Sequence, residues 1–373
     1  MLYLYTGATA FILAAFLMPL AIRILQRTGA VDAPSKDKIH STPTPRGGGI
    51  VIFLAFAIAV ILPNYRDNPM KGVLLGSAIC LFVGALDDLR GGVPAVFKLG
   101  ALTLATLVMS FFGVQLNLFG YYPLDLFFTW LWIVGVTSAF NGIDNMDGLA
   151  AGVAVIVSGM YLLIALDSYY LVYTQTSLSW FGLLASGLIG ANLGFLLYNL
   201  KPGKVFMGDA GSFFLGFILA ALGVMGEWAD SRVVACTIPL LILGVPIFDF
   251  AYIIIARITK GETRTLRSII EHCAPDHLSH RLVWFGFTQR KAVLIIYLMS
   301  VVLGLSGILL RNSERGIDSL IALIQGAAVL LLIAILMATA ERRHAKNAPV
   351  PLEEYRHDTA PPPAEEEDIR KTA

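Results

Sequence analysis

Residues 123–167 read PLDLFFTWLWIVGVTSAFNGIDNMDGLAAGVAVIVSGMYLLIALD. Two apolar runs, 123–140 and 148–167, each approach the ~20 residues that a helix needs to cross a bilayer. Between them stand Asn141, Asp144 and Asp147. Ionisable groups at membrane depth are costly and usually mark function or line a wet cavity. The stretch therefore predicts two membrane helices that keep carboxylates at their junction.

The composition extends this prediction to the whole chain. Of 373 residues, 57% are hydrophobic and only 14% are charged, whereas soluble domains average about 45–50% and about 25%. The three cysteines are widely spaced and form no disulfide or zinc pattern. We predict an all-α polytopic membrane protein of about eleven transmembrane helices, near 2–25, 48–63, 70–86, 96–113, 123–140, 148–167, 177–198, 210–226, 233–255, 291–310 and 318–340.

The basic residues predict the orientation of these helices. If the N-terminus lies outside, 22 of the 27 Lys and Arg residues fall on one side, which the positive-inside rule makes cytoplasmic. The C-terminus is then cytoplasmic too. Residues 1–341 form the membrane domain, and 342–373 form a charged, Pro-rich tail that we expect to be disordered.

With this topology, six carboxylates lie near the cytoplasmic side. Each one alone could be an ordinary helix-end residue, and Asp209 could simply begin a helix as its cap. Together they predict a divalent cation site, because oxygen ligands suit Mg²⁺, or alternatively Mn²⁺. The six are Asp87, Asp88, Asp144, Asp147, Asp209 and Asp249.

Two cytoplasmic loops supply cations beside these acids. The first contains KDKIHSTPTPRGGGI, with Lys38 and Arg46 before three glycines, and the last contains DHLSHRL, with His277, His280 and Arg281. Individually these residues are typical of a solvated positive-inside loop, and two histidines three apart could equally bind zinc. Acids for a metal, together with cations and a glycine loop, indicate a diphosphate site.

These motifs carry a resemblance. In order along residues 30 to 290, the chain has PTPRGGG, the Asp pair after the third span, NGIDNMDGLAAG, YNLKPGKVFMGDAGSFFLG, VPIFD and DHLSHRL. This combination resembles the polyprenyl-phosphate N-acetylhexosamine-1-phosphate transferases, the superfamily of the WecA, TagO and MraY enzymes. Each piece is weak alone, but the ordered set is specific.

The resemblance implies roles for individual residues. Asp87 and Asp88 would form the acidic pair near the lipid phosphate, as a base or only as a positioning pair. Asp209, with Asn141, would hold Mg²⁺. The residues implied to lie by the nucleotide are Asp144, Asp147, Asn199 and Phe206, with Phe206 stacked on uracil. From their own chemistry, the loop residues Lys38, Arg46, Arg281, His277 and His280 are expected to hold the remaining phosphate oxygens, the two histidines as candidate catalytic residues.

The chain departs from the usual family residues at two positions, and the absence of one motif indicates the branch of the family. Asn145 stands where relatives commonly have glycine, and Ser279 stands where WecA-like members often carry a further histidine. The three-histidine motif of the MraY branch is absent. We therefore expect a WecA/TagO-like enzyme, with the MraY-type phospho-N-acetylmuramoyl-pentapeptide transferase as the alternative.

The expected reaction transfers a sugar 1-phosphate, most simply N-acetylglucosamine 1-phosphate, from a UDP-N-acetylhexosamine to undecaprenyl phosphate. UMP is released. The enzyme would lie in the plasma membrane with a cytoplasmic site and no nucleic-acid partner, and a homodimer is compatible with the sequence. A secondary transporter, the alternative from another class, would place acids at the bilayer midplane between inverted repeats, and neither is seen here.

Overall fold

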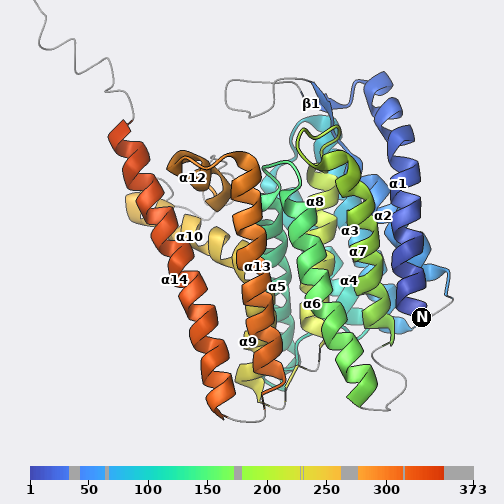
Figure 1. The fold of residues 1–373 in the computed structure, drawn as a ribbon. Coiled ribbons are helices and arrows are strands. Elements are labelled where there is room, and N and C mark those ends of the chain that lie inside the picture. Colours follow the sequence, from blue (N-terminus) through green and yellow to red (C-terminus); the bar gives the residue numbers. More distant parts are fainter. Residues whose placement is uncertain are drawn as a thin grey trace, which may run out of the picture.

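The protein is a bundle of long helices in the computed structural model, which describes residues 1–32, 43–63, 67–171, 179–226, 228–229, 231–261, 276–313 and 316–347 (Figure 1). The elements in chain order are α1 (Leu2–Thr28), β1 (Val31–Asp32), β2 (Thr44–Pro45), α2 (Gly48–Ile61), α3 (Asn68–Arg90), α4 (Ala95–Phe111), α5 (Tyr122–Ile143), α6 (Leu149–Leu171), α7 (Ser179–Asn199), α8 (Gly208–Met225), α9 (Arg232–Ile242), α10 (Gly244–Lys260), α12 (Leu278–Phe285), α13 (Gln289–Arg311) and α14 (Gly316–Asn347).

This architecture confirms the prediction of an all-α polytopic membrane protein. Within the described ranges, eight helices are long and apolar enough to cross a membrane, or nine if the bent pair α9–α10 is one span. Two other predicted spans form shorter apolar helices, α2 with 14 residues and α4 with 17. At 1.5 Å per residue these are about 21 and about 26 Å long, short of the ~30 Å hydrocarbon core.

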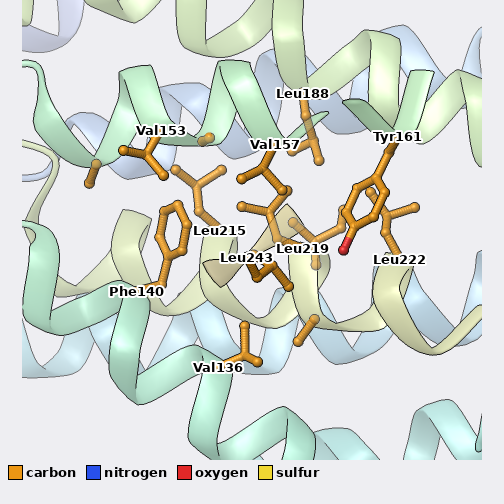
Figure 2. Packing of buried hydrophobic residues seen from close by; sticks show 14 of the residues in the cluster. Val136, Phe140, Val153, Val157, Tyr161, Leu188, Leu215, Leu219, Leu222 and Leu243 are labelled. Carbon is orange, nitrogen blue, oxygen red and sulfur yellow. The ribbon is translucent and has the colours of Figure 1, made fainter. Parts of the chain in front are cut away.

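Helix α8 forms the centre of the bundle and carries Asp209 in its first turn. Every residue from Ala210 to Val224 is buried, because α2, α3 and α5 pack around this helix. Its Leu215, Leu219 and Leu222 meet side chains of α5, α6 and α7 in the apolar core (Figure 2). A helix that is apolar on all sides can be buried in this way, so the start of α8 is held at one end of a close-packed scaffold.

The ninth predicted span, 233–255, is not one straight helix. It breaks at Leu243 into α9 and α10, whose axes differ by 86°. Pro246, in the first turn of α10, favours a break here, because it lacks the N–H that would donate to the Ile242 carbonyl in a continuous helix. Figure 1 shows α10 crossing the bundle near α12 and not running along it. The break turns Asp249, in the second turn of α10, toward α12.

Two short elements border the end of the bundle opposite the N-terminus. Strands β1 and β2 pair antiparallel, with Val31 opposite Pro45. They lie at the same end of the molecule as α12 in Figure 1. The first turn of α8, the last turn of α3 and the end of α5 also contribute to the site described next.

Candidate active site

The glycine loop and the start of α8, far apart in the sequence, lie side by side. Arg46 forms an isolated parallel bridge with Phe206, and the Phe206 N–H donates to the Pro45 carbonyl at 2.8 Å. The Phe206 carbonyl accepts from the N–H groups of Gly47 and Gly48. The Phe206 side chain is half-buried at this junction. The PTPRGGG and VFMGD motifs therefore form one structural unit.

Asp88 caps the N-terminus of α8 from a different helix. Its two carboxylate oxygens accept the N–H groups of Asp209 at 2.9 Å and Ala210 at 3.1 Å. Free N–H groups at a helix N-terminus favour a negative partner. Gly208 permits this contact, because its φ is +76° and a Cβ there would lie 2.4 Å from Asp88 Oδ2. One member of the acidic pair thus has a defined positioning role.

Asp209 lies between two cations. Its Oδ1 contacts Arg46 at 2.7 Å and its Oδ2 contacts Lys98 at 2.8 Å. The same cations reach the acidic pair, since Arg46 Nε lies 2.8 Å from Asp88 and Lys98 Nζ lies 3.0 Å from Asp87. Three carboxylates and two cations from the first loop, α3, α4 and α8 therefore form one charge cluster.

Lys98 is the residue of this cluster that the sequence did not single out. It stands in the first turn of α4, and in the sequence it is one of the many basic residues on the side predicted to be cytoplasmic. Its ammonium also lies 5.3 Å from the centre of the Phe213 ring. A lysine ten residues after an Asp pair has no specific signal in one sequence, because helix packing alone brings it to Asp209.

The stretch that joins α5 to α6 brings three further predicted residues to this end. Asn141 accepts a hydrogen bond from the Ser212 hydroxyl of α8 at 2.6 Å. The helix ends at Ile143, so Asn141, Asp144 and Asp147 do not continue one helical face, as they would if the helix ran on. Burial, together with Asp209 and Asp88, raises the pKa of Asp144 to about 7, although Arg46 opposes this shift.

Asp147 and Asn199 hold neighbouring loops together. The Asp147 carboxylate accepts the Gly203 N–H at 3.0 Å. The Asn199 side chain accepts from the Gly148 N–H and donates to the Val205 carbonyl, both at 2.8 Å. Asn199 is 6% exposed. Its contacts connect the loop after α5 with the segment that leads to Phe206, so the described geometry makes Asn199 a positioning residue.

The histidine motif is anchored by Asp249. His277 Nδ1 lies 2.7 Å from Asp249 Oδ2, and the Leu278 N–H donates to Asp249 Oδ1 at 2.7 Å. His280 lies one turn later on α12 and is half-buried. Burial and the neighbouring His277 lower the pKa of His280 below its usual value, which favours its neutral form at pH 7.

Arg281 is buried between α12 and α14. Its side chain is 2% exposed and donates to the Asp276 and Met337 carbonyls. It also pairs with Glu341 of α14 at 2.6 Å. A guanidinium surrounded by acceptors in this way has its charge satisfied within the protein. In the structure, Arg281 therefore holds α12 against α14.

One residue of the predicted site, Lys38, lies outside the described residues. Its expected contact with the diphosphate therefore stays a prediction from the sequence.

The donor atoms at this end fit Mg²⁺ in their chemistry. In the part of the chain that the structure describes, no three His, Cys, Asp or Glu side chains form a ready metal centre. Asp209 and Asn141 nevertheless offer a carboxylate and an amide oxygen, and Ser212 links them, since its hydroxyl also lies 3.5 Å from the Asp209 carbonyl. Mg²⁺ is commonly held by one or two carboxylates together with substrate phosphates, so these two oxygens fit a site that substrate phosphates would complete.

The arrangement is suited to bringing anions together. Arg46 and Lys98 can exchange carboxylate partners for phosphate oxygens, because both side chains retain partial exposure of 36% and 22%. Charge-assisted hydrogen bonds to phosphate are among the strong ones. The site can therefore neutralise several phosphate charges next to a hard-oxygen metal position.

Comparison of the sequence with known proteins identifies its relatives. The sequence model of glycosyl transferase family 4 matches residues 70–227. The chain is 36% identical over 310 residues to the probable undecaprenyl-phosphate N-acetylglucosaminyl 1-phosphate transferase of Bacillus subtilis, covering 79% of this chain and 81% of that protein. It is 32% identical to the decaprenyl-phosphate N-acetylglucosaminephosphotransferase of Mycobacterium tuberculosis, with 78% of each chain covered. It is 28% identical to the undecaprenyl-phosphate alpha-N-acetylglucosaminyl 1-phosphate transferase of Yersinia pestis, with 83% of each covered.

Because the similarity to these relatives extends over most of both chains, and the family model spans the positions of Asp87, Asp88, Lys98 and Asp209, the protein belongs to glycosyl transferase family 4, in its WecA/TagO-like branch.

Proposed function

We propose that the protein transfers N-acetylglucosamine 1-phosphate from UDP-N-acetylglucosamine to undecaprenyl phosphate and releases UMP. The observation that carries the proposal is the convergence of Arg46 and Lys98 on Asp209. Two phosphate-bearing substrates repel each other, and this cluster supplies cations where they would meet. The names of the relatives, which describe N-acetylglucosamine 1-phosphate transfer to polyprenyl phosphates, support the same reaction.

In this reaction, an oxygen of the lipid phosphate attacks the β-phosphorus of the UDP-sugar. The new P–O bond forms as the bond between the β-phosphorus and the bridging oxygen breaks, and UMP leaves with that electron pair. The second pKa of a phosphomonoester is about 6, so the lipid phosphate is mostly dianionic at cytosolic pH. A strong base is therefore not required, and Asp87 and Asp88 act by positioning Lys98, Arg46 and the start of α8.

We propose Mg²⁺ as the cofactor, held by Asp209 and Asn141. When bound, Mg²⁺ would neutralise charge on the diphosphate oxygens as a Lewis acid. Both Asp209 oxygens contact cations here, so Asp209 could hold the ion only if Arg46 and Lys98 turned from this carboxylate to substrate phosphates. Phe206 and Asp147, on adjoining loops, would contact the uridine, and His277 and His280 would contact the diphosphate.

The lipid chain also has a candidate position. A cavity of ≈ 820 Å³ lies among α5, α9 and α10 and extends to residues 113–118 and Arg232 at the opposite end of the bundle. Its largely apolar lining includes Trp132, Val136, Leu240 and Phe250. Val136 is little more than one turn from Asn141 on α5. We propose that part of the polyprenyl chain occupies this cavity while its phosphate reaches the charge cluster.

The proposed topology has eleven membrane segments in the plasma membrane, with the N-terminus outside and the site in the cytoplasm. The uneven division of the basic residues supports this orientation. Arg46, Lys98 and Arg257 lie at the site's end of the bundle, whereas Arg232 and Arg311 belong to the opposite helix ends. The carboxylates gather at one end and not at the midplane, which argues against a secondary transporter.

A direct assay tests the proposed function. Purified protein is incubated with polyprenyl phosphate, Mg²⁺ and a panel of radiolabelled UDP-sugars, and both labelled lipid and UMP are measured. We expect UDP-N-acetylglucosamine to give labelled lipid, with one UMP released for each lipid labelled. A labelled lipid formed only from UDP-N-acetylmuramoyl-pentapeptide would identify the MraY-type alternative, and no labelled lipid from any donor would overturn the proposal.

A further inference from the structure

Asp249 is a buried carboxylate whose two oxygens contact the consecutive residues His277 and Leu278. It is 1% exposed. Oδ2 contacts His277 Nδ1 and Oδ1 accepts the Leu278 N–H, each at 2.7 Å. A buried carboxylate is costly unless such partners satisfy it. The break at Leu243 places it there, because a continuous α9–α10 helix would run in a direction that differs by 86°.

The other side of the His277 ring is also fixed. A Cβ built on Gly142 would lie 2.6 Å from Cε1 and 3.3 Å from Nε2 of this ring. The ring therefore packs directly on the backbone at the end of α5, next to Asn141. Since Nδ1 faces Asp249, Nε2 is the ring nitrogen that remains for a ligand at this end of the bundle.

We propose that Asp249 is a positioning residue for the transfer reaction. It keeps a proton on His277 Nδ1 and so leaves Nε2 unprotonated, which makes Nε2 a hydrogen-bond acceptor for a substrate phosphate oxygen that carries a proton. Carboxylates that orient a histidine through Nδ1 have this effect in other enzymes, where they set the tautomer of the ring. This inference rests on the proposed function, because it requires a phosphate substrate beside Asn141.

The Asp249→Asn variant gives a specific consequence. The Leu278 N–H needs an acceptor, so the amide oxygen of the new side chain will face Leu278 and its NH₂ group will face His277 Nδ1. That NH₂ group is a donor, so Nδ1 must lose its proton and the ring changes tautomer. We expect kcat/KM for transfer to fall at least 10-fold, while KM for polyprenyl phosphate changes less than 3-fold.

A double-mutant cycle separates positioning from structural support. Activities of the wild type, Asp249→Asn, His277→Gln and the double variant are compared under the same conditions. If Asp249 acts through His277, the double variant will be no more than 3-fold slower than His277→Gln alone. Multiplicative losses would overturn the inference, and absence of transfer in the wild type would overturn the proposed function instead.

Two further measurements test the role of Asp249. The first does not depend on activity, and the second uses a variant at a different residue. Long-range ¹H–¹⁵N spectra of histidine-labelled protein, assigned with His277→Gln, should show the Nδ1–H tautomer in the wild type and its loss in Asp249→Asn. An unchanged tautomer would contradict the proposal. Gly142→Ala displaces the ring from the opposite side, so it should also lower transfer at least 10-fold. This second variant replaces Asp249→Asn in the test if Asp249→Asn fails to fold.

Asp167→Asn is the matched control. It makes the same chemical change in α6, where Asp167 pairs with Arg311 at 2.9 Å, away from the site. Transfer and the His277 spectrum should match the wild type. Equal losses in Asp167→Asn and Asp249→Asn would show that the effect is a general response to removing a carboxylate.

Discussion

The Ser279 hydroxyl donates a hydrogen bond to the Asn145 side-chain oxygen at 2.6 Å. The two positions at which the sequence departs from the usual residues of its family therefore contact each other. Asn145 also donates to the Gly142 carbonyl at 2.8 Å. This pair joins the loop that carries Asp144 and Asp147 to the helix that follows His277.

Replacing Ser279 by alanine should loosen that junction. The change leaves the Asn145 oxygen without this donor, and a single lost hydrogen bond costs about 1 kcal/mol. We expect a lower thermal midpoint and transfer reduced by ~5-fold, the rate equivalent of about 1 kcal/mol. Ser300→Ala is the control, because the Ser300 hydroxyl only bonds within its own helix, to the Ile296 carbonyl. Equal behaviour of the two variants would exclude a special role for the pair.

The metal proposal predicts the behaviour of Asp209→Asn. The change removes an anionic ligand without altering shape, so transfer should be abolished at every Mg²⁺ concentration while the protein remains folded. Activity is titrated with Mg²⁺ and folding is followed by thermal melting. Near-normal turnover of the variant at limiting Mg²⁺ would show that Asp209 is not the metal ligand.

Phe206 provides a test of nucleotide binding. If its ring stacks on uracil, Phe206→Ala should weaken UDP-sugar binding by about 1–3 kcal/mol. Calorimetric titration with UDP-N-acetylglucosamine measures this change. Phe111→Ala, at an 85% exposed ring at the end of α4, is the control. Unchanged affinity in Phe206→Ala would leave this ring with a packing role only.

Asp147→Asn keeps the volume and the acceptor for the Gly203 N–H but removes the charge. Transfer should fall at least ~10-fold, equivalent to about 1.4 kcal/mol in the barrier, with an unchanged thermal midpoint. Steady-state kinetics of Asp147→Asn and Asp144→Asn are measured together. Wild-type rates in both would mean that residues 141–147 only end one helix and begin the next.

Asp144 predicts a pH dependence of stability. Its pKa is raised to about 7 in the folded protein, against about 3.9 in an unfolded chain. Between these values the folded state binds the extra proton, so the stability contribution of Asp144 is present below about pH 4 and is lost as pH rises through 7. In EDTA, the wild-type melting temperature should therefore fall more steeply from pH 4 to 7 than that of Asp144→Asn. Parallel curves would contradict the raised pKa.

The sequence determined much of this protein without any structure. Apolar length and the position of carboxylates at span ends are local properties, so they predicted the helical segments around 123–140 and 148–167 and drew attention to Asp87, Asp88 and Asp209. The motifs also predicted the family, because PTPRGGG, NGIDNMDGLAAG and DHLSHRL occur in one order. The contacts that each motif makes with the other motifs could not be predicted in this way, because they join segments that are far apart in the sequence.

Tertiary structure decided which charges meet. Arg46 contacts Asp209 across 163 positions of sequence, and Lys98 contacts it across 111. Such pairings depend on how buried helices pack, and a single sequence contains no measure of that packing. For the same reason, the burial of Arg281 against Glu341 could not be foreseen, because a basic residue in a predicted loop has the same pattern whether it faces a substrate or another helix.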